Sequence, residues 1–411
     1  MLGSPSTPVP IWLLLVASMA LALPLSAQRT WVVDDTMSAG ADYPDLPSAY
    51  AAAADNDRIL VRRGTGQGYQ LPHGLTRPMR ILGELGTPKV VLLYPQMGIS
   101  CPANEVIVIS NFEVRAVGGD WFTSIANSPG LVVLSQLDYL TVRQIPVTPY
   151  RAHRVVMVDC RVNAWSSTVT AIESNLWLLN CQTTGLTGAS RDYLGGIEVI
   201  RGSFLRMVGG THVGGDGLGP CLPLQPGFYG HPAIYQAGPI VIAGRAQLRG
   251  GLWQRYNPSC GSGSNTLRQD GIAVDCFSGT VLDPMVLDLA PSLVPQCPYH
   301  QRREMPAVIP SPAQRGAAQT IRAHGPSASV VSVFVSFLSR YDPISLPIGD
   351  VWLDPSLTLH VGSGGVNGSR ELTLQTVIPN WLSLGDVLVY QAVSLSNNSF
   401  ELSQPGIAVV H

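Results

Sequence analysis

The sequence predicts an all-β protein: a stacked β-solenoid followed by a small antiparallel β-sandwich. Two segments share one template, an apolar run closed by an acid or amide and then a cysteine: Val155–Cys160 and Leu176–Cys181. Weaker copies of the run are Val106–Asn111, Leu131–Gln136 and Leu205–Gly210. Short strands that recur at intervals of roughly 20 to 40 residues, with no helical pattern between them, are typical of a solenoid.

Composition narrows the class of protein. With 411 residues the chain is long enough for two or more structural units. Only 13% of residues are charged, the net charge is −2, and no basic run is present, so nucleic acid is not an expected partner. The 42 glycines and 33 prolines suit turn-rich β structure, and 45% apolar content argues against disorder.

The N-terminus predicts export. Ile11–Leu23 is an unbroken apolar stretch, too short to span a bilayer comfortably, and Ser26–Gln28 follows it closely. We expect residues 1–27 to be a signal peptide cleaved after Ala27; the alternative is an uncleaved anchor. No later segment has membrane-spanning length, so the mature chain should lack a membrane span and be secreted or held at the cell surface.

The first elements can be placed in order. Trp31–Asp35 reads as a strand, and Pro47–Ala54 as a short helix with proline at its start. Arg58–Arg62 is a second strand, Gly64–Tyr69 a glycine-rich turn, and Leu75–Glu84 a third strand.

This order resembles the opening of pectin-lyase-like right-handed parallel β-helix proteins. In those proteins a capping helix precedes the pattern "hydrophobic-Val-x-x-Gly…Tyr", here Ile59–Tyr69, and then "Leu-x-x-Pro-hydrophobic-x-Ile-x-Gly", here Leu75–Gly83. The resemblance implies a right-handed parallel β-helix over residues 28–290. Its helix would cover a solenoid end whose open strand edges invite aggregation.

Later coils lengthen. Gly209–Pro232 and Gly250–Gln269 are rich in glycine, proline, aromatic residues and cysteine. Long loops on a regular scaffold commonly carry function. The proline-rich residues 291–326 read as a linker.

Short strands such as Val331–Phe337 and Val387–Ala392 predict a β-sandwich over residues 327–411. Val377–Gly385 with Tyr390–Ala392 resembles a C-terminal module common on exported bacterial proteins, although Leu402–Gln404 departs from its "Leu-Ser-Asn" ending. That resemblance implies a surface or sorting role.

Cys160 and Cys181 occupy equivalent positions on successive coils. Stacked strands lie about 4.8 Å apart, whereas disulfide Cβ atoms lie about 3.8 Å apart. We therefore expect stacked free thiols.

The remaining cysteines fit an oxidising compartment. Gly202–Arg206 and Gly244–Arg249 look like equivalent strand starts, which would put the next two cysteines in equivalent loops. Because four cysteines allow three pairings, one pairing is a hypothesis: Cys221 with Cys260 and Cys276 with Cys297, leaving Cys101 unpaired.

Lyase chemistry would need clustered acids for Ca²⁺ and a basic side chain. Only Arg268, Asp270 and Asp275 come near this pattern. Residues an odd number apart on a strand face opposite sides, so the two acids diverge unless a turn intervenes. The alternative is that Asp270 begins a turn and Asp275 caps a strand.

Glycoside hydrolysis needs paired carboxylates across a groove. Asp216 lies between two glycines and His231 between glycine and proline, but no Asp-Asp pair accompanies them. The polygalacturonase active site is therefore not carried over; a glycine turn and a loop histidine are the alternative.

Aromatic residues beside an arginine in the long loops could stack on sugars or hold a carboxylate, or could pack the loops onto the scaffold. The candidates are Trp253, Arg255, Tyr256, Tyr229 and Tyr235. No histidine or cysteine spacing predicts a metal or other cofactor.

The sequence thus predicts an exported, non-catalytic β-helix protein that binds carbohydrate or mediates surface contact through residues 209–270. Its expected partner is a polysaccharide or a cell-surface component. The alternative is a polysaccharide lyase or glycoside hydrolase acting on an acidic polysaccharide, with Ca²⁺ needed only by the lyase.

Overall fold

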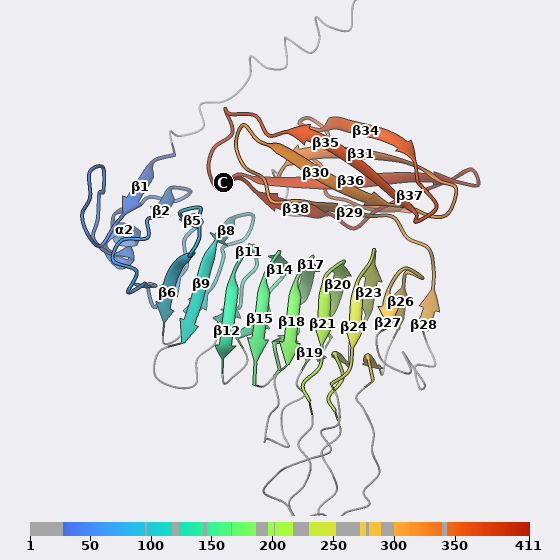
Figure 1. Cartoon of the computed structure of the whole chain (residues 1–411), viewed down its shortest axis with the longest axis horizontal. Coiled ribbons are helices and arrows are strands. Elements are labelled where there is room, and N and C mark those ends of the chain that lie inside the picture. Colours follow the sequence, from blue (N-terminus) through green and yellow to red (C-terminus); the bar gives the residue numbers. More distant parts are fainter. Residues whose placement is uncertain are drawn as a thin grey trace, which may run out of the picture.

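The computed structural model describes residues 28–94, 97–116, 123–142, 146–165, 167–185, 196–200, 202–216, 230–251, 272–276, 279–288, 300–338 and 343–411. Over these residues the protein is a parallel β-helix with an antiparallel C-terminal module beside it (Figure 1). The predicted fold class is confirmed.

Three parallel sheets form the β-helix, and each central coil contributes one strand to each sheet; over the described residues the end coils contribute to fewer. Sheet A contains β1 (Thr30–Val33), β2 (Arg58–Val61), β5 (Met79–Gly83), β8 (Val106–Ser110), β11 (Leu131–Ser135), β14 (Arg154–Val158), β17 (Asn175–Leu179), β20 (Phe204–Val208), β23 (Ile240–Ala243), β26 (Thr280–Leu282) and β28 (His300–Arg302). Sheet B contains β3 (Tyr69–Gln70), β6 (Val90–Tyr94), β9 (Phe112–Ala116), β12 (Asp138–Val142), β15 (Arg161–Ala164), β18 (Gln182–Gly185), β21 (Thr211–Val213), β24 (Gln247–Arg249) and β27 (Leu287–Asp288). Sheet C contains β4 (Gly74–Leu75), β7 (Met97–Ile99), β10 (Thr123–Ala126), β13 (Val147–Tyr150), β16 (Val169–Ile172), β19 (Ile197–Ile200), β22 (Ile234–Gln236) and β25 (Val274–Cys276).

The expected strand over Leu75–Glu84 is two strands, β4 and β5, in different sheets. Pro78 lies between them, and proline has no amide hydrogen to give to a ladder. The chain turns the corner from sheet C to sheet A at this point.

The expected helix is α2 (Leu46–Ala52), which begins after the N-cap Asp45. The Asp45 carboxylate accepts hydrogen bonds from the amide of Ser48, at 2.8 Å, and from its hydroxyl. Leu46 and Ala49 are buried in the same core as β1 and β2, so the helix packs on the first coils.

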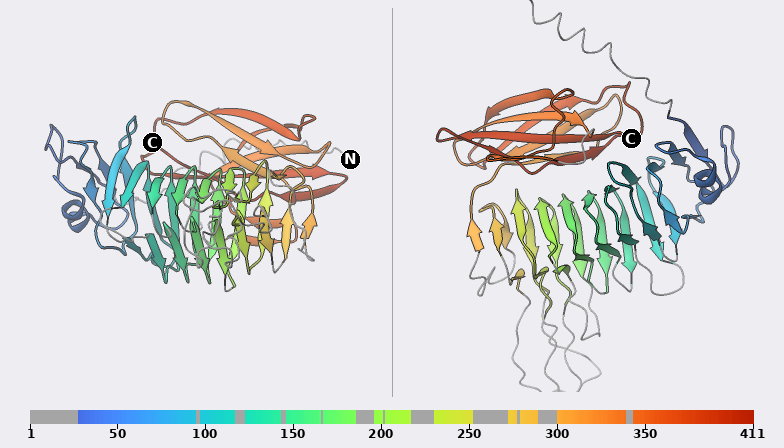
Figure 2. Two further views of the ribbon diagram at one scale, coloured as in Figure 1. Left: turned by 60° about the horizontal axis from the view of Figure 1, so that its bottom comes forward. Right: turned by 180° about the vertical axis from the view of Figure 1, so that it is seen from behind.

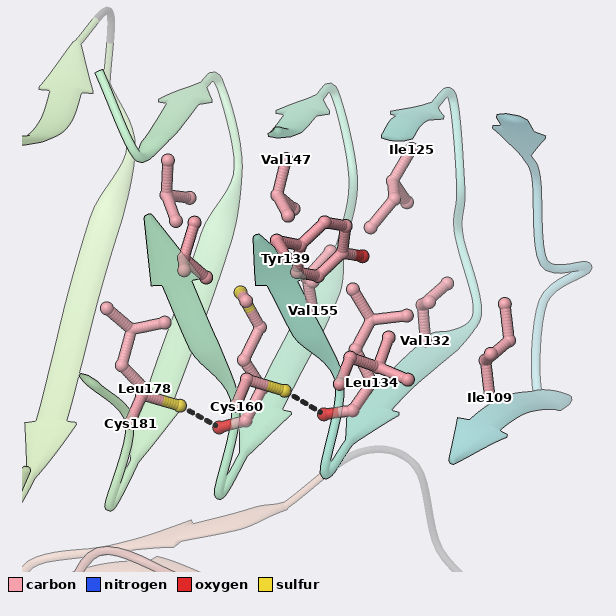
Figure 3. Packing of buried hydrophobic residues seen from close by; sticks show 14 of the residues in the cluster. Ile109, Ile125, Val132, Leu134, Tyr139, Val147, Val155, Cys160, Leu178 and Cys181 are labelled. Atoms are coloured by element: carbon pink, nitrogen blue, oxygen red, sulfur yellow. Dashed lines mark hydrogen bonds between the residues drawn. The ribbon is translucent and has the colours of Figure 1, made fainter. Parts of the chain in front are cut away.

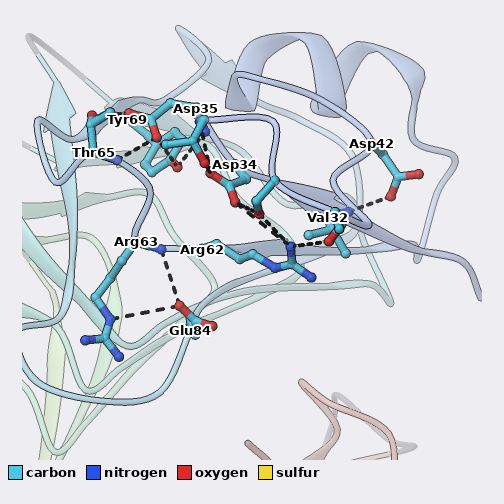
Figure 4. A network of polar contacts seen from close by, with 12 residues as sticks. Val32, Asp34, Asp35, Asp42, Arg62, Arg63, Thr65, Tyr69 and Glu84 are labelled. Atoms are coloured by element: carbon cyan, nitrogen blue, oxygen red, sulfur yellow. Dashed lines mark hydrogen bonds and ion pairs between the residues drawn. The ribbon is translucent and has the colours of Figure 1, made fainter.

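A polar network ties the first coils together (Figure 4). Asp35, just after β1, accepts a 2.7 Å hydrogen bond from the Thr65 amide and one from the Tyr69 hydroxyl. Neighbouring Asp34 accepts from the amide and hydroxyl of Thr36, and these bonds, with its bond to Ser38, lower its pKa. These carboxylates hold the turn after β2 against β1, which gives them a structural role.

The corner between sheets A and B explains the repeated sequence template. After the central sheet A strands, from β8 to β23, the next residue adopts a left-handed backbone, with φ of 64° at Asn111, 50° at Asp159 and 52° at Asn180. Asparagine, aspartate and glycine tolerate this conformation best. The residue after it then faces the interior, as Cys160 and Cys181 do.

The two cysteines form the predicted ladder of free thiols. The Sγ atom of Cys160 lies 3.3 Å from the carbonyl oxygen of Leu134, and that of Cys181 lies 3.3 Å from that of Met157 (Figure 3). Burial raises the pKa of the Cys181 thiol well above its usual value. Cys101, also predicted to be unpaired, is free and buried.

One predicted equivalence between coils is wrong. Gly202–Arg206 leads into sheet A, whereas Gly244–Arg249 leads into sheet B. The register shows the difference, because Leu205 pairs with Ile240. Nevertheless Cys221 and Cys260 do fall in consecutive connections from sheet B to sheet C, the first between β21 and β22 and the second between β24 and β25. Cys221, Cys260 and Cys297 lie outside the described residues, as does the side chain of Cys276 in β25.

The C-terminal module contains three antiparallel sheets. One is β29-β30-β35, a second is β34-β31-β36-β37 with β38 also on β36, and the third is β32-β33. Their bounds are β29 (Ala307–Pro310), β30 (Ala318–His324), β31 (Val330–Phe337), β32 (Ile344–Leu346), β33 (Gly349–Val351), β34 (Leu359–Gly365), β35 (Glu371–Val377), β36 (Val387–Ser396), β37 (Ser399–Leu402) and β38 (Gly406–Val409).

The expected linker over residues 291–326 differs from what the structure shows. β28 is the last strand of sheet A, and β29 and β30 already belong to the C-terminal module. β30 alternates buried and more exposed residues and pairs with β35 along its whole length. Pro310 is accommodated because it ends β29.

The C-terminal module lies along sheet A, as all views in Figures 1 and 2 show. Sheet A therefore buries both faces. Val155 and Met157 point into the β-helix core, whereas Val156 and Val158 point into a second core shared with Val389 and other residues of the module. Burial on both sides accounts for unbroken apolar runs where a half-exposed strand would alternate.

Ion pairs stabilise both ends of the interface between sheet A and the C-terminal module. Arg370 of the module forms a bidentate ion pair with the fully buried Asp283, at 2.9 Å for both nitrogens. At the other end Arg58 lies 3.3 Å from Asp386. Between them Trp177 of sheet A meets Trp352 edge to face, with ring centroids 5.3 Å apart.

Candidate functional site

The coils lengthen at one corner of the β-helix. The connections from sheet B to sheet C span residues 165–168 before β16, but 186–196 before β19, 214–233 before β22 and 250–273 before β25. These three insertions are consecutive, so their ends lie on neighbouring strands of sheet C. Loops stacked on adjacent rungs of a rigid scaffold are a common way to build a binding site.

Polar side chains line the outer face of the same strands. Backbone pairing puts Thr170, Glu198, Tyr235 and Asp275 side by side on β16, β19, β22 and β25. Their neighbours Ile197, Ile234 and Val274 are buried in the core, so alternation turns the polar residues outward. We call these four residues the sheet C ladder.

Glu198 is held in place by two hydroxyls. Thr170 donates a 3.0 Å hydrogen bond to Glu198 Oε2, and Ser167 donates a short one to Oε1. Both hydroxyls belong to the preceding coil. The carboxylate is therefore oriented by side chains across the ladder, and part of it remains accessible.

Asp275 is the second carboxylate of the ladder. Partial burial raises its pKa above the ordinary value for an aspartate. Two rungs separate it from Glu198, which puts their backbones about 9.6 Å apart at about 4.8 Å per rung. Tyr235 lies between the two acids and provides an aromatic ring and a hydroxyl.

Asp216 and His231 lie at the two ends of the insertion before β22. The amide of His231 donates to the carbonyl of Gly215 at 2.9 Å, and its own carbonyl accepts from Gly251 at 2.8 Å. Burial lowers the pKa of His231. Any Cβ at Gly214 would collide with the His231 carbonyl, so the glycine allows this close approach. These two predicted candidates thus mark the base of an insertion near the ladder.

The other predicted site residues cannot be placed. They lie outside the described residues: Arg268, Asp270, Trp253, Arg255, Tyr256 and Tyr229. Of the predicted set, the structure brings Asp275 and Tyr235 into register on one face.

Glu198 was missed by the sequence reasoning. Ile197–Ile200 alternates apolar and other residues, which indicates an outward Glu198, but its neighbours on the ladder follow only after long insertions. Register across such insertions depends on the three-dimensional pairing and is not readable from spacing.

Within the described ranges, no group of three or more His, Cys, Asp or Glu side chains could hold a metal ion. In the same ranges, no helix is long and apolar enough to cross a membrane. Comparisons with protein-family models, curated proteins and solved structures found no match for the chain.

Proposed function

We propose that this chain is an exported polysaccharide-binding protein whose binding face is the sheet C ladder together with the insertions beside it. The observation that carries the proposal is the coincidence of the two features: the coils lengthen on the same strands, β19, β22 and β25, that carry Glu198, Tyr235 and Asp275.

Chemistry favours a carbohydrate ligand. Carboxylates accept hydrogen bonds from sugar hydroxyls, and an aromatic ring between them offers an apolar surface to a pyranose face. The ladder repeats along the β-helix axis, so an extended polymer can meet several rungs at once. The resemblance to pectin-lyase-like β-helix proteins, which rests on Ile59–Tyr69 and Leu75–Gly83, agrees with this ligand class.

The ladder favours neutral polysaccharides over polyuronates. It contains two carboxylates, Glu198 and Asp275, and no basic side chain. Like charges repel, so an acidic chain would need a bridging cation.

The test is a panel of insoluble or immobilised polysaccharides, neutral and acidic, incubated with the full chain. Retention and release of soluble products are both measured. We expect retention on at least one neutral polymer, weakened up to about tenfold in affinity by Tyr235→Ala, since a stacked aromatic contact contributes about 0.5–1.5 kcal/mol. Retention that Tyr235→Ala and Glu198→Gln leave unchanged would contradict the proposed face.

A matched control is available on sheet B. Glu113 is also an outward, partly exposed carboxylate on the β-helix, paired with Arg115. Glu113→Gln changes the same chemical group on a coil without a long insertion, since the connection after β9 spans only residues 117–122. This variant should bind as the unaltered protein does.

Glycoside hydrolysis is a second candidate, favoured by one observation. Asp275 has a raised pKa, as a general acid requires, and Glu198 is two rungs away. The backbone separation of about 9.6 Å is close to the roughly 6.5–9.5 Å between the carboxyls of inverting enzymes. Product release that disappears in both Asp275→Asn and Glu198→Gln would support hydrolysis, whereas retention without release would support binding alone.

Export has its own test. Recovery of the protein outside the producing cell with Gln28 as its first residue would support a cleaved signal. Recovery with Met1 or Leu2 intact would support the uncleaved alternative.

A further inference from the structure

A second polar site lies on a different side of the molecule, at the seam between the β-helix and the C-terminal module. A cavity of about 180 Å³ opens there between sheet B and β29–β30. On the β-helix side it is lined by Gln182, Thr211 and Gln247, which are paired on neighbouring strands of sheet B. On the module side it is lined by Arg322 and His324 of β30.

His324 is the most unusual of these groups. It is 1% exposed, and neither ring nitrogen has a hydrogen-bond partner in the protein. Buried polar atoms are nearly always paired, because an unpaired one loses its hydrogen bonds to water without replacing them. A histidine kept in this state beside a polar cavity indicates a ligand that pairs with it.

Two arginines determine the charge of the ligand. Arg245, from the corner before β24, and Arg322 both line the cavity. Arg322 is exposed and forms no ion pair with a described residue, whereas Arg245 lies 3.9 Å from Glu371 and donates to the Ser369 carbonyl at 3.3 Å. Glu371 offsets part of the charge of Arg245, and the carboxylate of Asp159 interacts electrostatically with Arg322. Neither carboxylate lines the cavity, so the two guanidinium groups are the charged groups at its surface, next to its amide and hydroxyl donors.

We propose that this seam cavity binds an oxyanion, a sulfate or phosphate group, held by Arg245, Arg322 and His324 with donors from Thr211 and Gln247. Arginine guanidinium groups match the geometry of such oxygens, and a ring N–H adds a directed hydrogen bond. The cavity is large enough for one such group with water, and Arg245, whose side chain is 47% exposed, leaves an entrance. The oxyanion would then bridge the β-helix and the module.

The oxyanion has two sources that share this chemistry: a free inorganic ion, or an ester group on a larger molecule such as a sulfated glycan. Neither depends on the sheet C ladder, so the outcome here is independent of the proposed function.

The test is calorimetric titration of the full chain with sodium sulfate and with sodium phosphate, at constant ionic strength set by chloride. We expect saturable binding. Arg322→Gln, an exposed change that should not disturb folding, should weaken it about tenfold or more, because a hydrogen bond to a charged group is lost. Arg302→Gln, an exposed arginine in β28, is the matched control and should change the affinity by less than about twofold.

A second variant separates binding from folding. His324→Leu removes the unpaired nitrogens, so it should keep or raise the unfolding midpoint while weakening oxyanion binding several-fold. A purely structural histidine would show the opposite, a lowered midpoint with unchanged binding.

The source is distinguished by dextran sulfate against uncharged dextran. Binding of both sulfate and dextran sulfate, weakened by Arg322→Gln, assigns an ester group; binding of sulfate alone assigns the free ion. The proposal is overturned if sulfate and phosphate show no saturable binding, or if Arg322→Gln binds like the unaltered protein. A non-saturating rise in thermal stability is the general effect of excluded salts and does not count as binding.

Discussion

Sheets A and C are built by the same coils, yet their outer faces are opposite in character. The outer face of sheet A carries Val133, Val156 and Trp177 on successive rungs, all buried under the C-terminal module. The outer face of sheet C carries Thr170, Glu198 and Tyr235 on successive rungs; Thr170 is buried and donates to Glu198, whereas Glu198 and Tyr235 are partly exposed. The repeat specifies the scaffold, and the outward residues decide what each face contacts.

The comparison predicts a large difference for one substitution placed on each face. Val156→Asp buries an unpaired carboxylate between the β-helix and the C-terminal module. It should lower the free energy of unfolding by more than about 4 kcal/mol, or separate the module from sheet A. Thr148→Asp, outward on sheet C, should change stability by less than about 0.5 kcal/mol. Urea unfolding and limited proteolysis of both variants measure the difference; equal midpoints would refute the distinction between the faces.

The ion pair at the far end of sheet A gives the next largest effect. Arg370→Met leaves the fully buried Asp283 charge without its bidentate partner, which should cost about 3–5 kcal/mol. Adding Asp283→Asn removes that charge and should recover part of the loss in the same urea assay. A double variant as unstable as the single one would show that Arg370 acts through some other contact, such as its 2.8 Å bond to the Gly325 carbonyl.

Acid should destabilise the protein through three buried histidines. Burial lowers the pKa of His212, His324 and His411 to about 4 each, against 6.5 for an ordinary histidine. As the pH falls below 6.5, these histidines become protonated in the unfolded chain while they stay neutral in the folded protein, which favours unfolding. Their contribution to stability is therefore complete above pH 6.5 and is lost as the pH falls toward 4. Each unit of pKa difference is about 1.4 kcal/mol. His411→Gln, which keeps a hydrogen-bonding group for Ser110, should flatten the fall in urea midpoint between pH 7 and pH 4.5. An unchanged slope would exclude His411 as a contributor.

A smaller effect is expected where the chain turns between sheets A and B. Asn180 has a φ of 52° and donates a 2.6 Å hydrogen bond to Asp159. Asn180→Ala should cost about 1–2 kcal/mol through backbone strain and the lost bond. Asn180→Gly retains the backbone freedom and should cost less. If Asn180→Gly unfolds at a lower temperature than Asn180→Ala, the left-handed backbone does not explain why an acid or amide closes each apolar run.

The smallest stability effect is expected on the sheet C ladder. Glu198→Gln keeps the shape and one of the two acceptor oxygens, and its amide NH2 can donate to the second hydroxyl. Unfolding should therefore shift by less than about 1 kcal/mol even though polysaccharide retention falls. A change of several kcal/mol would instead make Glu198 a structural residue.

Much of this contrast could be predicted from the sequence, and part could not. The apolar runs before Asp159 and Asn180 predicted stacked strands, and the equivalent positions of the cysteines that follow predicted a ladder of free thiols. The left-handed corner at Asp159 and Asn180 was not predicted from the sequence. The same runs were apolar on both faces, a signal of burial from both sides that the prediction of two successive modules did not use. Strand β30 also alternates, but the prolines around it favoured a linker.

The ladder itself required the structure. Asp275 and Tyr235 were candidates from the sequence, Asp275 because it lies near Arg268 and Asp270, and Tyr235 because it is an aromatic residue beside a long loop. Their alignment with Glu198 depends on how each insertion closes, and loop closure is set by contacts far apart along the chain. The cationic seam cavity has the same origin, since Arg245 and His324 come from different modules.

The most direct test of the account is hydroxyl-radical footprinting of the full chain, alone and saturated with a polysaccharide that the panel retains. Trp177 and Trp352, 2% and 3% exposed, should stay unlabelled in both samples, whereas the 70% exposed Trp381 should be labelled in both. Tyr235 should be labelled in the free protein and protected by the polysaccharide. Labelling of Trp177 in the free protein, or labelling of Tyr235 that the polysaccharide does not change, would contradict the division between a docking face and a binding face.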